Sequence, residues 1–295
     1  MKFTVLIVFS VLAVLSSLFV GAADISIQGG LLALVGRGES SDILIMQKLR
    51  LPRALLAAFI GAGLGASGAA LQGYTRNALA APGILGFSAC AAFGAVVALY
   101  FGFSSWVPLA ALLGAGAGTA LILILAGPRK SAATLILAGV GVGALASAMT
   151  GLLMNFAPNP WALSEIVYWL MGSLRNAELG GLQICAPLTL LGLGILWYIG
   201  SDLRALSLGE DTAATLGVSL GRLKVLLVMG VALCVGSGVA IAGSIGFVGL
   251  FVPHILRMIF GPDPARLIFL SALGGAGFLA FADTATRLMS GPGTT

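Results

Sequence analysis

A long stretch without charge is the feature that most constrains how this chain can fold. Between residues 77 and 128 no side chain is charged, and in the whole chain of 295 residues only 8% are charged against 59% hydrophobic. A soluble domain carries about 25% charged residues because its surface must face water. The sequence therefore indicates an integral membrane protein. Its net charge of +5 does not point to nucleic acid, because basic residues in membrane proteins mostly report loop orientation and headgroup contact.

Charge-free runs of spanning length recur along the chain. A helix needs about 20 apolar residues to cross a bilayer, and cutting the apolar runs at turn signals predicts an all-α bundle with about nine membrane segments. Residues 251–260 are too short to cross alone and predict a half-helix, while the Trp- and Tyr-containing stretch 161–174 predicts an interfacial helix. The predicted segments are 3–23, 54–75, two within 77–128 divided at 102–106, 131–156, 179–201, 225–246, 251–260 and 265–282.

The N-terminal segment and the basic residues predict the topology. Residues 1–23 could pass for a signal peptide, but the apolar run is long and favours a retained first helix. With the N-terminus inside, nine basic residues face the cytoplasm and six face outward, which favours this orientation. The basic cluster at 48–53 lies on the predicted outer face, against this charge bias, so its position needs an explanation other than topology. Residues 53–73 and 222–243 also resemble each other in opposite predicted directions, as in an inverted repeat.

Three polar stretches interrupt the apolar background. In the first, 48–88, Arg50 and Arg53 bracket Pro52 on the predicted outer face, where the arginines either reach the headgroups or serve a function. In the second, 202–224, acidic residues open a short predicted helix that ends at Gly217, either as a docking surface for a soluble partner or as a plain connecting loop. The third, 246–267, holds the only histidine of the sequence, His254.

The sequence lacks the signature motifs of several functional classes. No P-loop, GxSxG or HExxH pattern occurs, so the chain has no visible energy source and is not predicted to be an enzyme or to hold a cofactor. No carboxylate lies in mid-segment, apart from Asp283 near a segment end, which argues against a proton- or sodium-driven carrier. One histidine excludes a histidine-built metal centre, and the three cysteines are predicted to be buried small hydrophobes.

Taken together and in order, four motifs resemble the FecCD-type permeases, which include BtuC-like proteins. These are the membrane subunits of bacterial ATP-binding-cassette (ABC) importers for iron-siderophores, haem and cobalamin. The resemblance covers nearly all of the chain from about residue 45 to 287. Its motifs are RLPRALLA…SGAALQ…RNALAAPGILGFS (50–88), LGEDTAATLGV (208–218), GSIGFVGLFVPHILRMIFGPDPARL (243–267) and ADTATR (282–287).

The resemblance implies partners and a location. It implies a multi-pass protein of the bacterial cytoplasmic membrane that works in iron or cobalamin transport. Two copies of a separate ABC-type ATPase would drive it, beside a second permease copy, identical or paralogous. A periplasmic or lipid-anchored binding protein would deliver substrate, with membrane lipid around the bundle and no nucleic acid involved. Nothing in the sequence separates an iron chelate from haem or cobalamin.

The resemblance also implies roles for particular residues. The outer basic residues Arg50, Arg53 and Arg287 match positions that dock the binding protein, and His254 and Arg257 are expected to stabilise the inner layer. A translocation path between two copies is expected near Gly65, Ser67, Gly68 and Gln72. ATPase coupling within 202–224 is expected to involve Leu208, Gly209, Glu210, Asp211, Ala214 and Gly217.

One departure from the resembled family concerns the end of the chain. Family members have ten helices and continue for about 30 residues more, so a permease domain over 1–287 followed by an atypical tail, 288–295, is expected to lack the last helix. Two alternatives stay open at this point. One is a truncated, non-functional remnant or scaffold, and the other is a secondary carrier of the drug/metabolite type, which would need no ATPase.

Overall fold

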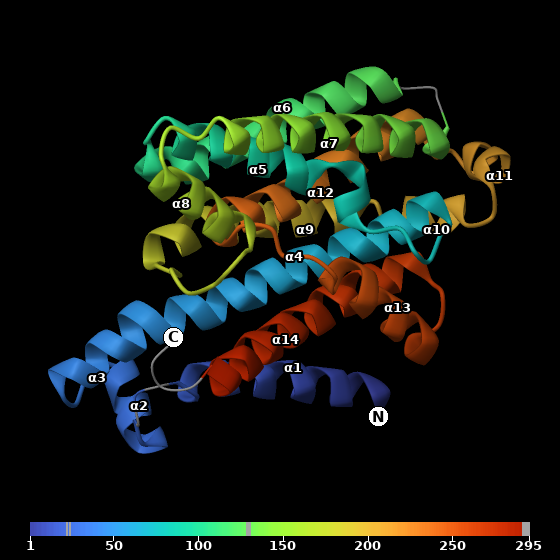
Figure 1. Cartoon of the computed structure of the whole chain (residues 1–295). Coiled ribbons are helices and arrows are strands. Elements are labelled where there is room, and N and C mark those ends of the chain that lie inside the picture. The colour runs from blue at the N-terminus through green and yellow to red at the C-terminus, as the bar shows by residue number, and fades with distance from the viewer. Residues whose placement is uncertain (22, 24, 128–130, 291–295) are drawn as a thin grey trace.

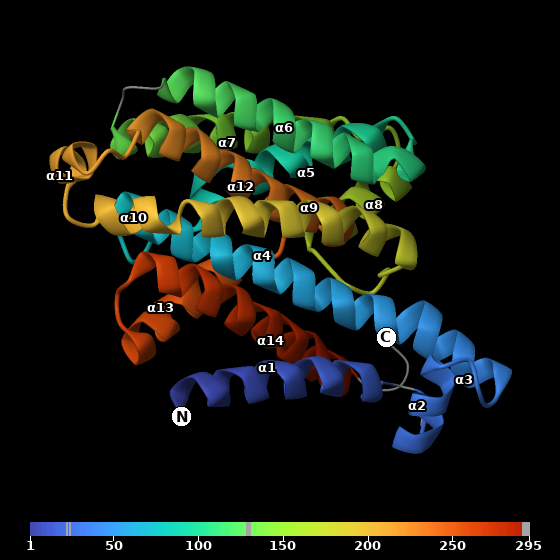
Figure 2. The ribbon, with the colours of Figure 1, turned by 180° about the vertical axis from the view of Figure 1, so that it is seen from behind.

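The fold is all helical in the part of the chain that the structure describes. The computed structural model describes residues 1–21, 23, 25–127 and 131–290, and no strand occurs among them. The longer helices run side by side as an elongated bundle (Figures 1 and 2). Helices α1–α7 span Lys2–Phe19, Ile27–Leu34, Ser40–Leu44, Leu51–Thr75, Phe87–Tyr100, Val107–Ala126 and Ala132–Asn155. Helices α8–α14 span Pro160–Leu170, Leu179–Tyr198, Gly200–Leu206, Glu210–Thr215, Leu220–Ala242, Val248–Phe260 and Pro264–Ser290.

The predicted membrane segments all have helical counterparts in the described residues. Seven helical stretches are long and apolar enough to cross a membrane, and two further apolar helices, α5 and α13, are shorter. Helix α13 begins at Val248, three residues before the predicted half-helix, and α8 lies at one end of the bundle where the interfacial helix was expected (Figure 1). Helix α14 continues to Ser290, beyond the predicted end at 282. Of the predicted tail 288–295, residues 291–295 lie outside the described residues.

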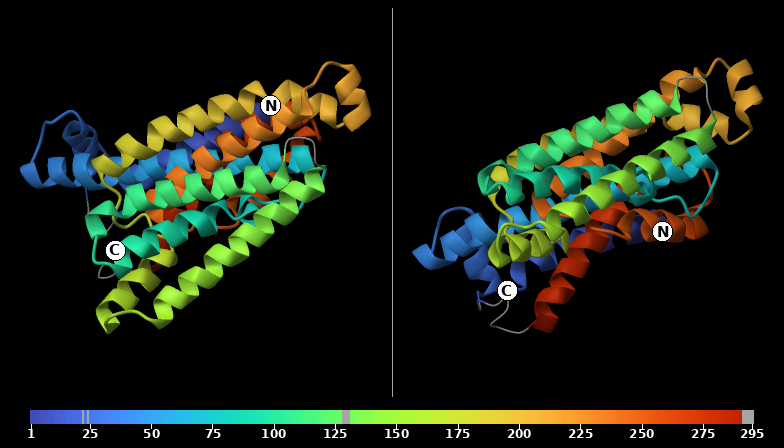
Figure 3. Two further views of the ribbon diagram at one scale, coloured as in Figure 1. Left: turned by 90° about the horizontal axis from the view of Figure 1, so that it is seen from above. Right: turned by 45° about the horizontal axis from the view of Figure 1, so that its top comes forward.

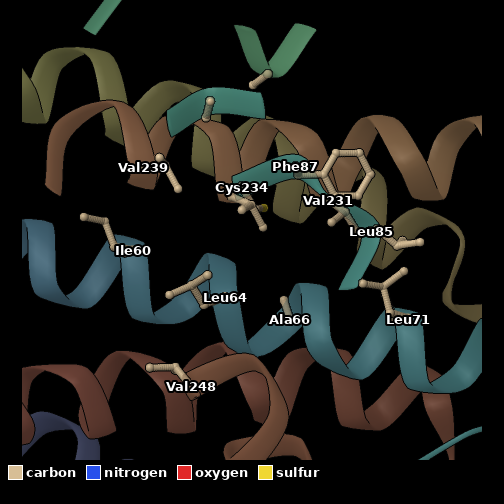
Figure 4. Close-up of a cluster of buried hydrophobic side chains, with 14 of the residues drawn as sticks. Ile60, Leu64, Ala66, Leu71, Leu85, Phe87, Val231, Cys234, Val239 and Val248 are labelled. Carbon is tan, nitrogen blue, oxygen red and sulfur yellow. The ribbon is translucent and has the colours of Figure 1, made fainter. Parts of the chain in front are cut away.

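Helix α4 is the central element of the bundle. It packs against α9, α12, α13 and α14, and it runs through the middle of the molecule between the upper helices and the α1–α14 pair (Figure 2). Figure 4 shows Ile60, Leu64 and Leu71 of α4 directed toward Val231 and Val239 of α12. Burial of such side chains by neighbouring helices gives α4 its fixed place between the two halves.

Glycines allow α4 to approach α13 and α14 closely. A Cβ atom at Gly61 would collide with the backbone of Gly275, and one at Gly65 with the backbone of Ser271, both in α14. A Cβ at Gly68 would likewise collide with the carbonyl oxygen of Gly249 in α13. In lipid, where apolar burial does not drive helices together, such small-residue contacts are what lets helices associate by van der Waals packing.

The two ends of the bundle carry different elements. At one end lie α2, α3 and α8 with the last turns of α1 and α14, and at the other lie α10, α11 and the N-terminus (Figures 1 and 3). The first end carries the residues predicted to face outward and is called the outer end below. The second carries those predicted to face the cytoplasm and is called the inner end.

Candidate functional site

A short helix projects from the inner end of the bundle. Helix α11 stands apart from the membrane helices (Figure 1), and a glycine with positive φ lies on each side of it, Gly209 at 114° and Gly217 at 87°. Glycine adopts such angles without the steric cost that a Cβ would add. The two glycines therefore let the chain turn sharply out of α10, form α11, and return to α12.

The surface of this projection mixes acidic and apolar side chains. Leu208 and Leu216 are 66% and 62% exposed, and Glu210, Asp211 and Ala214 are exposed beside them. Ala213 is fully buried and fixes α11 against the bundle, as do the buried Leu203 and Leu206 of α10. Exposed leucines beside carboxylates at the end of a membrane bundle form a surface suited to a soluble partner.

An ion pair ties α10 to the turn between α13 and α14. Arg204 donates from Nε and Nη2 to the two carboxylate oxygens of Asp263, at 2.9 and 2.7 Å. Burial alone would raise the pKa of Asp263, but the hydrogen bonds and charge of Arg204, with backbone N–H groups of Ala265 and Arg266, lower it. The segment that carries α11 is thus linked to the start of α14.

A second polar link at the inner end joins α13 to α4. Arg257 donates from Nη2 to Oε1 of Gln72 at 2.6 Å, and the Gln72 amide donates to the carbonyl oxygen of Leu250 at 3.4 Å. His254 lies on the same helix, partly exposed, with no side-chain hydrogen bond among the described residues. The inner-layer role predicted for His254 and Arg257 stays a prediction. Of these two side chains, Arg257 is the one that makes a hydrogen bond among the described residues.

At the outer end, two arginines pair with one buried carboxylate, and a third bonds to the backbone at the end of α1. Arg53 pairs with Asp283 through Nε and Nη2, at 3.1 and 2.9 Å, and Arg287 reaches the same carboxylate at 3.1 Å. Arg287 also donates to the carbonyl oxygens of Val20 and Ser17 at the end of α1. Arg50 donates to the carbonyl oxygens of Phe19 at 3.0 Å and Ala23 at 2.5 Å.

This geometry corrects one expectation about the outer basic cluster. Arg50 and Arg287 were predicted to lie on an outward-facing rim, yet they are only 5% and 8% exposed. Their guanidinium groups satisfy backbone carbonyls at the end of α1, which otherwise lack hydrogen-bond donors. Arg53 is the most accessible of the three, with 17% of its side chain exposed. The cluster therefore fastens α1 to α4 and α14.

The residues expected along a translocation path lie inside the bundle. Ser67 is 0% exposed and Gln72 is 2% exposed, and Gly65 and Gly68 are buried at the helix contacts described above. In this structure all four face neighbouring helices of the same chain. Within the single chain, close packing of α4 against α13 and α14 buries Gly65, Ser67 and Gly68, and the expectation that the four residues lie near a path between two copies stays a prediction.

A cavity of about 460 Å³ lies elsewhere, between η2 (Pro82–Leu85), α5, α7 and the start of α13. Its polar lining is made of hydroxyl groups, from Ser88, Ser147, Thr150 and Ser244, and none of the residues that line it is charged. Phe247, also in the lining, has a φ of 70°, which is rare for a bulky residue. No sequence pattern predicted this cavity, since its lining comes from five separate stretches of the chain.

The comparisons with known proteins decide the family. The FecCD transport family matches residues 7–295. The chain belongs to the FecCD transport family. It is therefore the permease of an ABC importer of the FecCD type, and a protein of the cytoplasmic membrane.

Individual FecCD relatives agree with this assignment along most of the chain. The vitamin B12 import permease BtuC of Vibrio cholerae is 40% identical over 84% of this chain and 76% of its own length. The Fe(3+)-citrate import permease YfmD of Bacillus subtilis (strain 168) is 33% identical over 99% and 88%. A solved inward-facing structure of a metal-chelate type ABC transporter matches with a TM-score of 0.87 and 33% identity, over 96% of this chain and 89% of that one.

Proposed function

We propose that this FecCD permease moves a metal chelate or a corrinoid inward, with a separate ATPase supplying the work through α10 and α11. The observation that carries the proposal is the exposed projection at the inner end, with its two leucines and two carboxylates. The chain has no nucleotide-binding motif of its own. Relatives named for cobalamin and for Fe(3+)-citrate support a large chelate as substrate.

The ATPase contact is assigned to Leu208, Gly209, Glu210, Asp211, Ala214 and Gly217. The leucine that flanks each glycine offers an apolar anchor, and buried apolar anchors carry most of the energy of protein interfaces. The Arg204–Asp263 pair gives a route by which movement of α11 reaches α14. Two ATPase copies would act on two permease copies, identical or paralogous.

The binding protein is assigned to the outer end. Arg53 is partly exposed beside Asp283, and the basic side chains of Arg37, Lys48 and Arg175 are exposed at the same end. Exposed charges of one sign set the rate and register of an encounter more than its affinity. Arg50 and Arg287 would act there indirectly, because they hold the end of α1 that supports this surface.

The translocation path is assigned to the side of the bundle that carries the hydroxyl-lined cavity. Support comes from its lining, because uncharged walls with a few hydroxyl groups offer no fixed charge to trap a chelate. The strained backbone at Phe247 adds support, since strain of this kind gathers at functional positions. Gly65 and Gly68 would then act as packing residues behind the path, with Ser67 and Gln72 beside them.

The test is copurification of the ATPase from the native membrane in gentle detergent. Replacement of Leu208 and Leu216 together by Glu is expected to remove the ATPase from the purified complex while the permease still elutes as a single species. A matched control is Leu31→Glu, an exposed leucine at the opposite end (54% exposed), which should keep the ATPase. Equal ATPase recovery with all three proteins would refute the coupling surface, and an absence of ATPase from the wild type would refute the proposed ATPase partner itself.

A further inference from the structure

A small basic cavity opens at the inner end, apart from the α11 surface. Its volume is about 250 Å³, and it lies where the end of α4 meets α10 and the turn between α13 and α14. Its polar lining comes from Gln72, Arg76, Ser207 and Arg257, and Pro262 and Pro264 close one side. Residues far apart in the sequence thus contribute guanidinium, amide and hydroxyl groups to one space.

Arg257 is held in place within this cavity. Its Nη2 donates to Gln72 Oε1 at 2.6 Å, and Gln72 is itself 2% exposed and bonded to the backbone of Leu250. This single bond to a neutral amide leaves further N–H donors of the guanidinium available, because arginine carries five. Arg76 also lines the cavity; it ends α4 in a left-handed conformation with φ of 52° and is exposed.

The charges of the cavity are not balanced by the protein. No residue that lines it is acidic, and none of the ion pairs among the described residues involves Arg76 or Arg257. The nearest carboxylate in sequence, Asp263, is already held by Arg204 through two hydrogen bonds. Two guanidinium groups with an amide and a hydroxyl form an arrangement that suits a phosphate and repels a cation.

The surroundings of the cavity favour a lipid as the source of the phosphate. Arg257 shares α13 with Met258 and Ile259, whose side chains are 76% and 42% exposed, so apolar surface suited to acyl chains adjoins the basic groups. Lys2 donates to the carbonyl oxygen of Ile259 at 3.1 Å and adds a third cation at the inner end. Basic pockets between membrane helices on the cytoplasmic side bind anionic headgroups.

We propose that this cavity binds the headgroup phosphate of an anionic phospholipid of the inner leaflet. Arg257, positioned by Gln72, and Arg76 contact the phosphate oxygens. Ser207 lies in the wall beside them, with its hydroxyl donating to the carbonyl oxygen of Arg204 at 2.6 Å. The bound lipid fixes the end of α4 to the turn before α14. The site is independent of the chelate path, and its occupancy is measurable without any transport assay.

The experiment measures lipid retention by the purified full-length chain. Protein is exchanged into mixed micelles of neutral detergent with phosphatidylglycerol or with phosphatidylcholine, and bound lipid is counted by native mass spectrometry. Each of Arg76→Gln and Arg257→Gln is expected to weaken phosphatidylglycerol binding about fivefold, and the double variant about 30-fold. Ser207→Asp, which adds a negative charge at an exposed wall residue without removing an arginine, is expected to weaken it as well.

The control is Arg266→Gln, a basic residue at the same end that stacks on Phe260 outside the cavity. It should bind phosphatidylglycerol as the wild type does. Inorganic phosphate is titrated in parallel: displacement of lipid only at high concentration supports the lipid source, whereas phosphate binding without lipid retention assigns the same cavity to free phosphate and overturns the lipid assignment. Wild-type phosphatidylglycerol retention by both Ser207→Asp and the double arginine variant would overturn the site itself.

Discussion

The two ends of this permease use charge in opposite ways. At the outer end, Arg50 and Arg287 are buried with Asp283, and their guanidinium groups bond to the last carbonyls of α1. At the inner end, Arg204 and Asp263 pair in an exposed position, with 60% and 38% of their side chains accessible. A buried charge is costly unless it is paired and hydrogen-bonded, so the outer cluster must stay assembled, whereas solvent can replace the inner pair.

This difference fits what each end has to do. The outer cluster joins α1, α4 and α14 into one unit, and this is the surface to which we assign the binding protein. At the inner end, the buried Leu203, Leu206 and Ala213 hold α10 and α11 against the bundle, and the charged link to the turn before α14 is an exposed ion pair. Charge therefore holds the outer end together, whereas apolar burial holds the inner end and leaves its ion pair open to solvent.

Removal of the outer carboxylate should have the largest effect. Asp283→Asn leaves the Arg53 and Arg287 guanidinium groups without their counter-ion, and breaking a buried pair in this way costs about 3–5 kcal/mol. We expect a clear loss of thermal stability in detergent, measured by unfolding monitored with size-exclusion chromatography. The matched inner-end change, Asp263→Asn, should leave the unfolding temperature almost unchanged. If Asp283→Asn and Asp263→Asn lowered the unfolding temperature equally, the proposed difference between the two ends would be wrong.

Close packing along α4 should give an intermediate effect. Gly68→Ala places a Cβ against the carbonyl oxygen of Gly249, and overpacking of this kind costs about 1–3 kcal/mol. The control is Gly116→Ala in α6, where a Cβ would meet nothing within 4 Å. The same unfolding assay should separate the two variants. If Gly68→Ala is neutral for unfolding yet reduces uptake, Gly68 acts in the path and the packing role is wrong.

The inner ion pair should give the smallest effect and a characteristic pH dependence. The pKa of Asp263 is lowered in the folded state, so the pair contributes stability above the unfolded pKa of about 3.9, and this contribution is lost as the pH falls through the folded pKa. Solvent and salt screen an exposed pair. The small difference in unfolding temperature between wild type and Asp263→Asn, measured in low salt from pH 7 to pH 3, should therefore shrink toward zero. A difference that grows on acidification would contradict the assignment.

Local pattern was enough to predict the membrane helices and α11, but not the short helices α2 and α3. Apolar runs predicted each membrane helix, GFSSW marked the turn between α5 and α6, and LGEDTAATLG predicted the separate short helix at α11. The predicted helix ended at Gly217, whereas α11 ends at Thr215 with Gly217 in the turn that follows. The motifs of residues 50–88 and 243–267 carried the family resemblance, which the match over residues 7–295 confirmed.

Pattern could not predict which polar residues face inward. The sequence pattern predicted Arg50 and Arg53 as an exposed pair, because it does not show that Asp283 and the end of α1 lie next to them across the bundle. Gly65 and Gly68 were expected to line the translocation path, because a small residue can line an opening or a helix contact equally well.

The sequence by itself determined the class of protein, the order of its membrane helices and the short helix at α11, since hydrophobicity and turn residues act over neighbouring positions. Only the tertiary structure decided the direction in which each charge points. A guanidinium group acquires its role from the carboxylates and carbonyls within about 3 Å of it, and in this chain such a partner can come from a segment more than two hundred residues away, as with Arg53 and Asp283.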